Sequence, residues 1–174
     1  SLVEGTGIAI ENGILVDELC RTSVPDVFAA GDVANWWHPR LQRRLRVEHF
    51  DNAGQQGAAA GMSMAGTGEP YAPIPYFWSD QYEVNLQWAG FPGSWERLVL
   101  RGDPAEPSLT GFYLAGGRVQ AAVTINQPRE FRAARRIVEA GVAIDPAVLA
   151  DPNTDLRALS RRLPRDGASP TDED

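Results

Sequence analysis

The pattern with the clearest chemical potential is the pair Gly31-Asp32, which ends the run TSVPDVFAAGD at residues 22–32. The apolar residues 27–30 before this pair predict a short buried strand. Asp32 would then lie at the carboxyl end of a strand, where open α/β sheets bind their ligands. A glycine at that point lets the backbone approach a cofactor closely. The pattern therefore predicts a ligand-binding carboxylate.

The cysteine, histidine and basic residues of the chain exclude several kinds of reaction and of metal site. Cys20 is the one cysteine, which excludes an internal disulfide, a CxxC redox pair and a cysteine-rich metal site, so we expect an inert thiol. His38 and His49 are the two histidines, and their separation does not suit a metal site. We assign no catalytic residue and no metal ligand. All 16 basic residues are arginine, which excludes lysine-based Schiff-base or phosphate-loop chemistry.

Composition excludes several classes of protein. A chain of 174 residues that is 43% hydrophobic can bury the core of one or two domains. The net charge of -7 argues against nonspecific nucleic-acid binding, which needs a basic face. No apolar run approaches the ~18 residues of a membrane span, and the N-terminus lacks a signal-peptide pattern. We therefore expect no membrane partner and a cytoplasmic location.

The first part of the chain predicts an α/β arrangement. Asn12-Gly13 favours a tight hairpin between residues 8–10 and 14–16. Residues 36–46 show little periodicity and predict a surface loop, which carries Arg40, Arg43, Arg44 and Arg46. Asp51 or Asn52 would cap a helix that runs to about Ala65 and stops at Gly66.

That predicted helix is unusual in its glycines. Gly54, Gly57 and Gly61 fall close to one stripe of the helix. Each glycine costs about 1 kcal/mol of helix propensity relative to alanine. We expect close approach of this stripe to a sheet or to a cofactor to offset the cost.

The Gly/Pro-rich connector at residues 66–75 predicts a domain boundary, and an antiparallel pattern follows it. Alternation predicts strands near residues 84–88 and 97–101, and Gly116-Gly117 predicts a hairpin between residues 109–115 and 118–125. Pro128 and Gly141 would begin and end a helix, and shorter helices are expected at residues 146–150 and 154–163. The predicted fold is an α/β remnant of a cofactor-binding domain at residues 1–70, then an α+β domain with an antiparallel sheet and flanking helices at 71–163. Residues 164–174 predict a disordered acidic tail.

Four sequence blocks together resemble one family. They are PDVFAAGDVA at residues 25–34, RVEHFDNA at 46–53, PYFWSDQ at 75–81 and INQPREF at 125–131. Their joint occurrence resembles the FAD-dependent, NAD(P)H-linked ferredoxin reductases that serve Rieske-type dioxygenases and bacterial cytochrome P-450 systems. The resemblance extends to about Arg162. It implies FAD as cofactor, NAD(P)H as hydride donor and a ferredoxin-type iron–sulfur protein as electron acceptor.

The resemblance also implies roles for individual residues. In the Gly31-Asp32 pair, Asp32 would hydrogen-bond the ribityl chain of FAD. Phe50 would touch the flavin ring region. Asn52 and Ala53 would point backbone N–H groups at the pyrimidine end of the ring, where a helix N-terminus stabilises the anion of reduced flavin.

Three further residues complete the implied cofactor site. Glu48 would pair with an arginine or lie near the nicotinamide, with an ordinary surface glutamate as the alternative. Tyr76 and Trp78 would pack near the ring on one side of an extended segment, with Phe77 on the other side. Their alternative is the start of a core strand.

The chain also departs from the family. The two GxGxxG fingerprints are absent, because Gly5 and Gly7 precede a hairpin instead of a helix. We therefore expect the C-terminal portion of a longer reductase, which alone would not bind FAD tightly. An apoptosis-inducing-factor-like or other NADH:FAD oxidoreductase and a noncatalytic interaction or dimerisation module stay open as alternatives, and so does a homodimer.

Two arginine clusters stand out in this acidic chain. One is the predicted loop at residues 40–46, and the other comprises Arg129, Arg132, Arg135 and Arg136. Either cluster could steer docking of an acidic ferredoxin, or simply form a solvated face.

Overall fold

The computed structural model describes residues 3–164. The chain divides into two compact units, Ser1–Pro73 (unit 1) and Ile74–Asp174 (unit 2). The domain bounds 1–70 and 71–163 stay predictions. Apart from Pro164, the predicted acidic tail lies outside the described residues.

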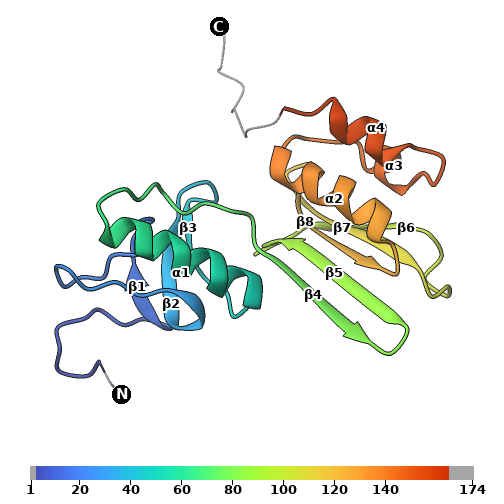
Figure 1. The fold of residues 1–174 in the computed structure, drawn as a ribbon. Coiled ribbons are helices and arrows are strands. Elements are labelled where there is room, and N and C mark those ends of the chain that lie inside the picture. The colour runs from blue at the N-terminus through green and yellow to red at the C-terminus, as the bar shows by residue number, and fades with distance from the viewer. Residues whose placement is uncertain (1–2, 165–174) are drawn as a thin grey trace, which may run out of the picture. The chain divides into compact units, whose positions relative to one another are not determined.

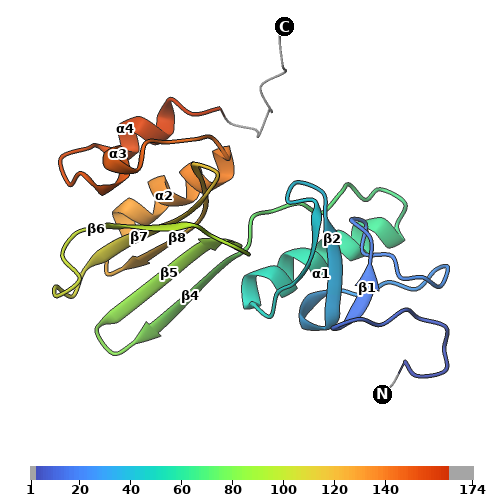
Figure 2. The same ribbon diagram turned by 180° about the vertical axis from the view of Figure 1, so that it is seen from behind.

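Unit 1 contains a three-stranded mixed sheet with one long helix on it (Figures 1 and 2). The strands are β1 (Ile14–Val16), β2 (Ala34–His38) and β3 (Arg43–Arg46), in the order β1-β2-β3. β1 pairs with β2 in parallel, and β2 pairs with β3 antiparallel. The helix is α1 (Phe50–Met64), and a single 3₁₀ turn, η1 (Gly31–Val33), precedes β2.

The prediction of a surface loop at residues 36–46 is wrong, because a hairpin of β2 and β3 occupies this segment. Trp36 lies opposite Leu45 in the antiparallel ladder, and neither side chain is appreciably exposed. The flanking arginines made the segment look polar. Arg44, however, donates through Nη1 to the carbonyls of Val16 and Asn35, both at 2.9 Å, so it braces the sheet.

The prediction of a buried strand at residues 27–30 is also wrong. The segment makes an isolated bridge between Arg21 and Phe28, and the Ala29 N–H donates to the Cys20 carbonyl at 3.1 Å. These residues are half-buried, and no neighbouring strand of unit 1 continues the ladder. The Asn12-Gly13 turn is confirmed, with φ of 48° and 110°, although only a bridge between Ile10 and Ile14 precedes β1.

Unit 2 contains an antiparallel sheet in the order β4-β5-β8-β7-β6 (Figure 1). Its strands are β4 (Tyr76–Gln81), β5 (Val84–Gly90), β6 (Arg97–Arg101), β7 (Leu109–Ala115) and β8 (Arg118–Ile125). The predicted Gly116-Gly117 hairpin is confirmed, and both glycines have the positive φ, 55° and 72°, that such a turn needs.

Helices lie on one face of this sheet. α2 (Pro128–Ala140) packs across β5, β8 and β7, while α3 (Pro146–Ala150) contacts β6 and α4 (Leu156–Arg161) contacts α2. The predicted start and stop of α2 are confirmed: Pro128 is its first residue, and Gly141 caps it with φ of 62°. Phe131, Ala134, Ile137 and Val138 form its buried stripe.

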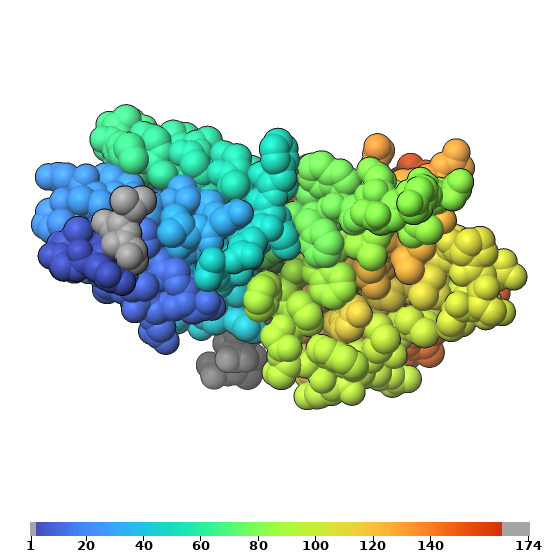
Figure 3. All heavy atoms as spheres, turned by 90° about the horizontal axis from the view of Figure 1, so that it is seen from below, coloured from blue at the N-terminus to red at the C-terminus, as the bar shows by residue number. Residues whose placement is uncertain are grey.

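The other face of the sheet, opposite α2, α3 and α4, carries Phe77, Trp88 and Tyr113 (Figure 1). Figure 3 views unit 2 from below, where the green and yellow residues of its strands and loops are in sight.

No helix within residues 3–164 is long and apolar enough to cross a membrane. The predicted fold class, an α/β remnant followed by an antiparallel α+β unit, is confirmed.

Candidate functional site

The Gly31-Asp32 pair forms the start of η1. Gly31 has φ of 76°, a conformation that glycine adopts without strain. Asp32 is exposed, and its backbone carbonyl accepts a hydrogen bond from Arg46 Nε at 2.9 Å. Its carboxylate makes no hydrogen bond or ion pair with any of residues 3–164. The side chain is therefore available to an external hydroxyl donor.

The N-terminus of α1 is the second part of the site. The helix begins after His49, whose side chain does not cap it, so the predicted caps Asp51 and Asn52 are wrong. Asn52 is buried instead: its Nδ2 donates to the Val47 carbonyl at 3.2 Å, and its Oδ1 accepts from the Tyr71 hydroxyl at 3.2 Å. Burial raises the pKa of Tyr71, which keeps that hydroxyl protonated as the donor. Asn52 thus fixes the first turn of the helix from inside.

The two parts meet through Gly31. A Cβ added to Gly31 would lie 3.5 Å from Ala53 Cβ, so η1 lies close to the first turn of α1. Gln56, one turn further along α1, is fully buried, and its Oε1 accepts the Gly31 N–H at 2.8 Å. The structure therefore brings Gly31, Asp32, Asn52 and Ala53 to one place. Gln56 was not among the predicted site residues, because its partner Gly31 lies 25 residues away in the sequence.

Glu48 and Phe50 precede α1 on the surface. Glu48 pairs with Arg46 at 2.7 Å, so arginine pairing is the observed contact among the alternatives considered for it. Arg46 also donates to Asn12 Oδ1 at 3.2 Å, and thus links the hairpin turn, η1 and the approach to α1. Phe50 is 85% exposed, so its ring is open to a binding partner.

The glycine stripe of α1 does not approach the sheet. Gly54, Gly57 and Gly61 are exposed, and a Cβ at any of them would meet no atom within 4 Å. The buried face is formed by Asn52, Gln56 and Ala60, which lie at a different angle around the helix. The expected close packing against the sheet is therefore wrong, and the approach to a cofactor stays a prediction.

Tyr76 and Trp78 lie on β4, in unit 2. Their rings stack with centroids 5.7 Å apart, and the Tyr76 ring also packs against Phe131 of α2 at 5.3 Å. The Arg135 guanidinium lies 5.3 Å from the Tyr76 ring centroid. Phe77 points to the opposite face, so the predicted alternation is confirmed. Trp78 is 44% exposed, which leaves much of its indole open.

The histidines and the cysteine have structural surroundings. His38 is fully buried, with Nδ1 accepting the Leu41 N–H at 3.2 Å and Nε2 lying 3.1 Å from the Pro73 carbonyl. These contacts place the proton on Nε2, and burial lowers the pKa of His38. Burial raises the pKa of Cys20 to about 11. Within residues 3–164 no cluster of His, Cys, Asp and Glu could hold a metal ion.

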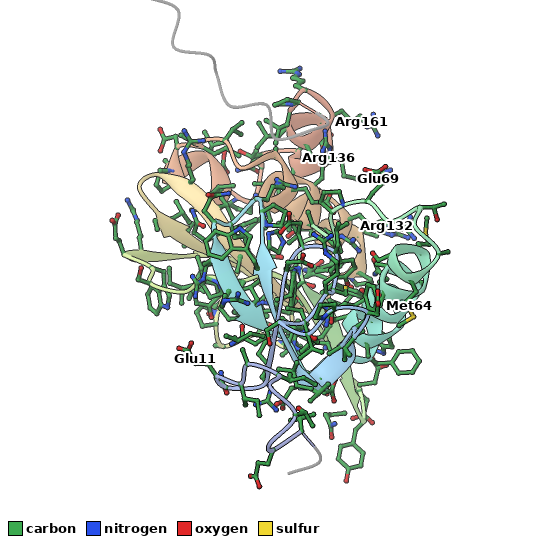
Figure 4. The ribbon with its side chains drawn as sticks, turned by 90° about the vertical axis from the view of Figure 1, so that its left-hand side faces the viewer. Glu11, Met64, Glu69, Arg132, Arg136 and Arg161 are labelled. Atoms are coloured by element: carbon green, nitrogen blue, oxygen red, sulfur yellow. The ribbon has the colours of Figure 1, made fainter. Side chains whose placement is uncertain are left out.

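A cleft lined by arginines lies between α2 and α4. It has a volume of about 510 Å³, and four arginines line it together with Ala133 and Ser160. The four are Arg132 and Arg136 on α2 and Arg157 and Arg161 on α4, each pair spaced by four residues; Figure 4 labels three of them. We call this feature the arginine cleft. Arg132 and Arg136 belong to the predicted 129–136 cluster. Arg135, from the same cluster, does not line the cleft and pairs with Glu139 at 2.9 Å.

Two family models match parts of this chain. Residues 76–160 match the family model described as Reductase C-terminal, and residues 1–57 match Pyridine nucleotide-disulphide oxidoreductase. The anthranilate 1,2-dioxygenase system ferredoxin–NAD(+) reductase component of Burkholderia cepacia is 43% identical over 91% of this chain. Putidaredoxin reductase of Pseudomonas putida is 33% identical, again over 91% of the chain.

Solved structures give the same result. The covalent putidaredoxin reductase–putidaredoxin complex matches 92% of the chain, with a TM-score of 0.86 and 32% identity. A ferredoxin reductase from Rhodopseudomonas palustris matches 91%, with a TM-score of 0.85 and 30% identity. This chain covers 39% of the Burkholderia relative and 37% of the Pseudomonas one, so it spans less than half their length.

Proposed function

Because this chain corresponds to the C-terminal part of the FAD-dependent ferredoxin reductases, we propose that it completes the FAD site of such an enzyme. The whole enzyme would take a hydride from NAD(P)H onto FAD and pass single electrons to a ferredoxin-type iron–sulfur protein of an oxygenase system. FAD supplies the change from two-electron to one-electron chemistry. The residues of this chain bind, orient and shield the cofactor.

One observation carries the proposal. The Asp32 carboxylate makes no hydrogen bond or ion pair within residues 3–164, and its turn η1 lies next to the start of α1. A ribityl hydroxyl would donate to Asp32, and an ionised acceptor makes the stronger kind of hydrogen bond. The backbone N–H of Asn52, in the first turn of α1, would stabilise negative charge on the reduced ring, whereas the Ala53 N–H already donates to the His49 carbonyl at 2.9 Å. The Gly31 N–H links these two elements, because it donates to Gln56 Oε1 on α1 at 2.8 Å.

The aromatic residues would border the ring. Phe50 is 85% exposed, as a residue at the border of a binding site would be. Tyr76 is immobilised by Phe131 and by Arg135, and Trp78 stacks on it, so the pair forms a rigid aromatic edge. A rigid edge excludes water from a flavin at little cost in side-chain entropy.

A reconstituted enzyme tests the cofactor site. In it, residues 1–174 would follow the N-terminal part of the Burkholderia relative; we call it the joined reductase. We expect the joined reductase to purify with FAD and the isolated chain to bind FAD weakly. A joined reductase that folds without taking up FAD would overturn the proposal.

The role of Asp32 has a matched control. Asp32→Asn removes the charge and keeps the shape, and should raise the dissociation constant of FAD about tenfold. Asp26 is also exposed, and its φ of 63° is one that asparagine tolerates, so Asp26→Asn should leave binding unchanged. Equal effects of the two substitutions would remove Asp32 from the site.

We propose the arginine cleft as a docking surface for an acidic iron–sulfur acceptor. Four arginines line it and no aspartate or glutamate does; one of them, Arg136, also donates to the Leu163 carbonyl at 3.2 Å. Like charges at a spacing of four residues repel each other within a helix, and an acidic partner would relieve that repulsion and raise the association rate. This proposal refines the sequence expectation, because Arg135 and Arg44 are engaged elsewhere.

Kinetics of the joined reductase test this docking surface. Arg157→Gln with Arg161→Gln should slow reduction of a [2Fe–2S] ferredoxin and flatten its salt dependence, while ferricyanide reduction stays unchanged. Arg129→Gln is the matched control, because Arg129 is exposed on α2 and does not line the cleft. An unchanged salt dependence would exclude the cleft, and activity with ferricyanide but no ferredoxin would favour the other NADH:FAD oxidoreductases.

A further inference from the structure

We infer that Gln56 is a positioning residue of the flavin site, which fixes the Gly31-Asp32 turn against α1. The effect of Gln56 on FAD binding rests on the proposed function, whereas the hydrogen bond between Gln56 and Gly31 is observed within unit 1. Gln56 touches neither of the groups proposed to meet the cofactor directly. It acts through the backbone of Gly31.

The contact joins segments that are 25 residues apart in sequence. The Gln56 side chain is fully buried, and its Oε1 lies 2.8 Å from the Gly31 nitrogen. Since Gly31 N–H is a donor, it fixes which end of the amide faces the turn. Gln56 Nε2 then has no hydrogen-bond partner within the described residues. The orientation of this amide is thus set by the turn alone.

The turn is held from its other side as well. Arg46 Nε donates to the Asp32 carbonyl at 2.9 Å, so one bond grips each of the two residues. The Gln56 backbone carbonyl lies 3.9 Å from Cys20 Sγ, in the buried layer below the turn. Gln56 is therefore placed by α1 and by Cys20, and it places Gly31 in return.

Loss of the Gln56 acceptor would leave a buried N–H unsatisfied. The turn would shift until this N–H found water or another acceptor. Asp32 would then move relative to the N-terminus of α1, although both are proposed to hold the same cofactor. Displacements well below 1 Å matter when two groups must meet one ligand together.

Amide hydrogen exchange in the isolated 174-residue chain tests the contact without any cofactor. Gln56→Met keeps the length of the side chain and removes the acceptor. The Gly31 N–H should then exchange about tenfold faster. Gln55→Met is the matched control, because Gln55 is exposed on the same helix and bonds Asp51 at 2.6 Å. Equal protection of Gly31 in both variants would overturn the inference.

The joined reductase tests the consequence. Gln56→Met should raise the dissociation constant of FAD about tenfold and alter the visible flavin spectrum, and Gln56→Glu, which retains an acceptor oxygen, should restore most of the affinity. If Gln56→Met does not fold, Gln56→Asn, one methylene too short, should show the loss that Gln56→Glu avoids. Equal FAD affinity across these variants and Gln55→Met would overturn the positioning role. If the unsubstituted joined reductase lacks FAD, the proposed function fails, and hydrogen exchange still decides the inference.

Discussion

Arg101 and Glu130 form a largely buried ion pair, with 2.9 Å between Nε and Oε1, that fastens β6 to the first turn of α2. The Arg101 side chain is 8% exposed and also donates to three backbone carbonyls, of Asp151, Pro152 and Thr154. Glu130 accepts a further hydrogen bond from the Thr110 hydroxyl at 2.7 Å. One guanidinium thus ties the sheet, α2 and the segment between α3 and α4 together.

Arg101→Met should lower the free energy of unfolding by about 3 kcal/mol, because it leaves Glu130 without its counter-ion. Arg135→Met removes a more exposed pair and should cost less than about 1 kcal/mol. Urea unfolding followed by circular dichroism measures both. Similar losses for the two variants would show that the buried pair is not special.

Gly61→Ala should raise the stability of the isolated chain by about 0.5–1 kcal/mol. The added methyl group meets no atom within 4 Å, and Gly61 lies within α1. Gly31→Ala should instead destabilise by about 1–2 kcal/mol, because φ is 76° there. Thermal unfolding distinguishes the two, and a loss of stability from Gly61→Ala would contradict the open space seen around the stripe.

The stability of unit 1 should fall as the pH drops below 6.5. Burial, and secondarily Arg40, lowers the pKa of His38 from its ordinary value of 6.5. The unfolded chain therefore binds this proton first, and stability is lost as pH falls from 6.5 toward the folded pKa. The pKa values of Asp151 and Asp155 lie below 3.8, mainly through backbone hydrogen bonds, so their contribution is lost only in stronger acid.

Urea midpoints between pH 5 and 8 measure this effect. His38→Gln should flatten the profile. A profile that keeps its slope in His38→Gln would assign the dependence to another group.

Cys20 should resist thiol reagents in the folded chain. Its pKa is raised to about 11 by burial and by Asp17, so very little thiolate forms at pH 8. Labelling by dithiobis(nitrobenzoate) should be at least about a hundredfold slower than in urea. Equal rates with and without urea would mean that the thiol is not protected.

Local signals explain why unit 2 could be predicted so well from its sequence. The Gly116-Gly117 turn, Pro128 and Gly141 act within a few residues, and each lies where the pattern placed it. In unit 1, the 27–30 segment was predicted as a strand from its apolar residues, but a strand also needs a neighbour along its length. The β2–β3 hairpin was hidden because Arg44 and Arg46 flank the buried Leu45.

The candidate site likewise combines residues that local sequence patterns indicated with residues that depend on distant contacts. Family blocks indicated Gly31, Asp32, Asn52 and Ala53, and the structure brings them together. Gln56 and Arg46 could not be predicted, because their partners in the turn lie 25 and 14 residues away. Contacts of this range depend on the tertiary fold and leave no periodic trace in the sequence.

The arginine cleft has one property that follows from its residue type. A guanidinium group stays protonated throughout the physiological range and beyond, and it is not a target of lysine acetylation. The charge of the cleft is therefore constant with pH. Ionic strength and the concentration of competing anions can therefore weaken its attraction for an acidic group, whereas a change of pH leaves its charge as it is.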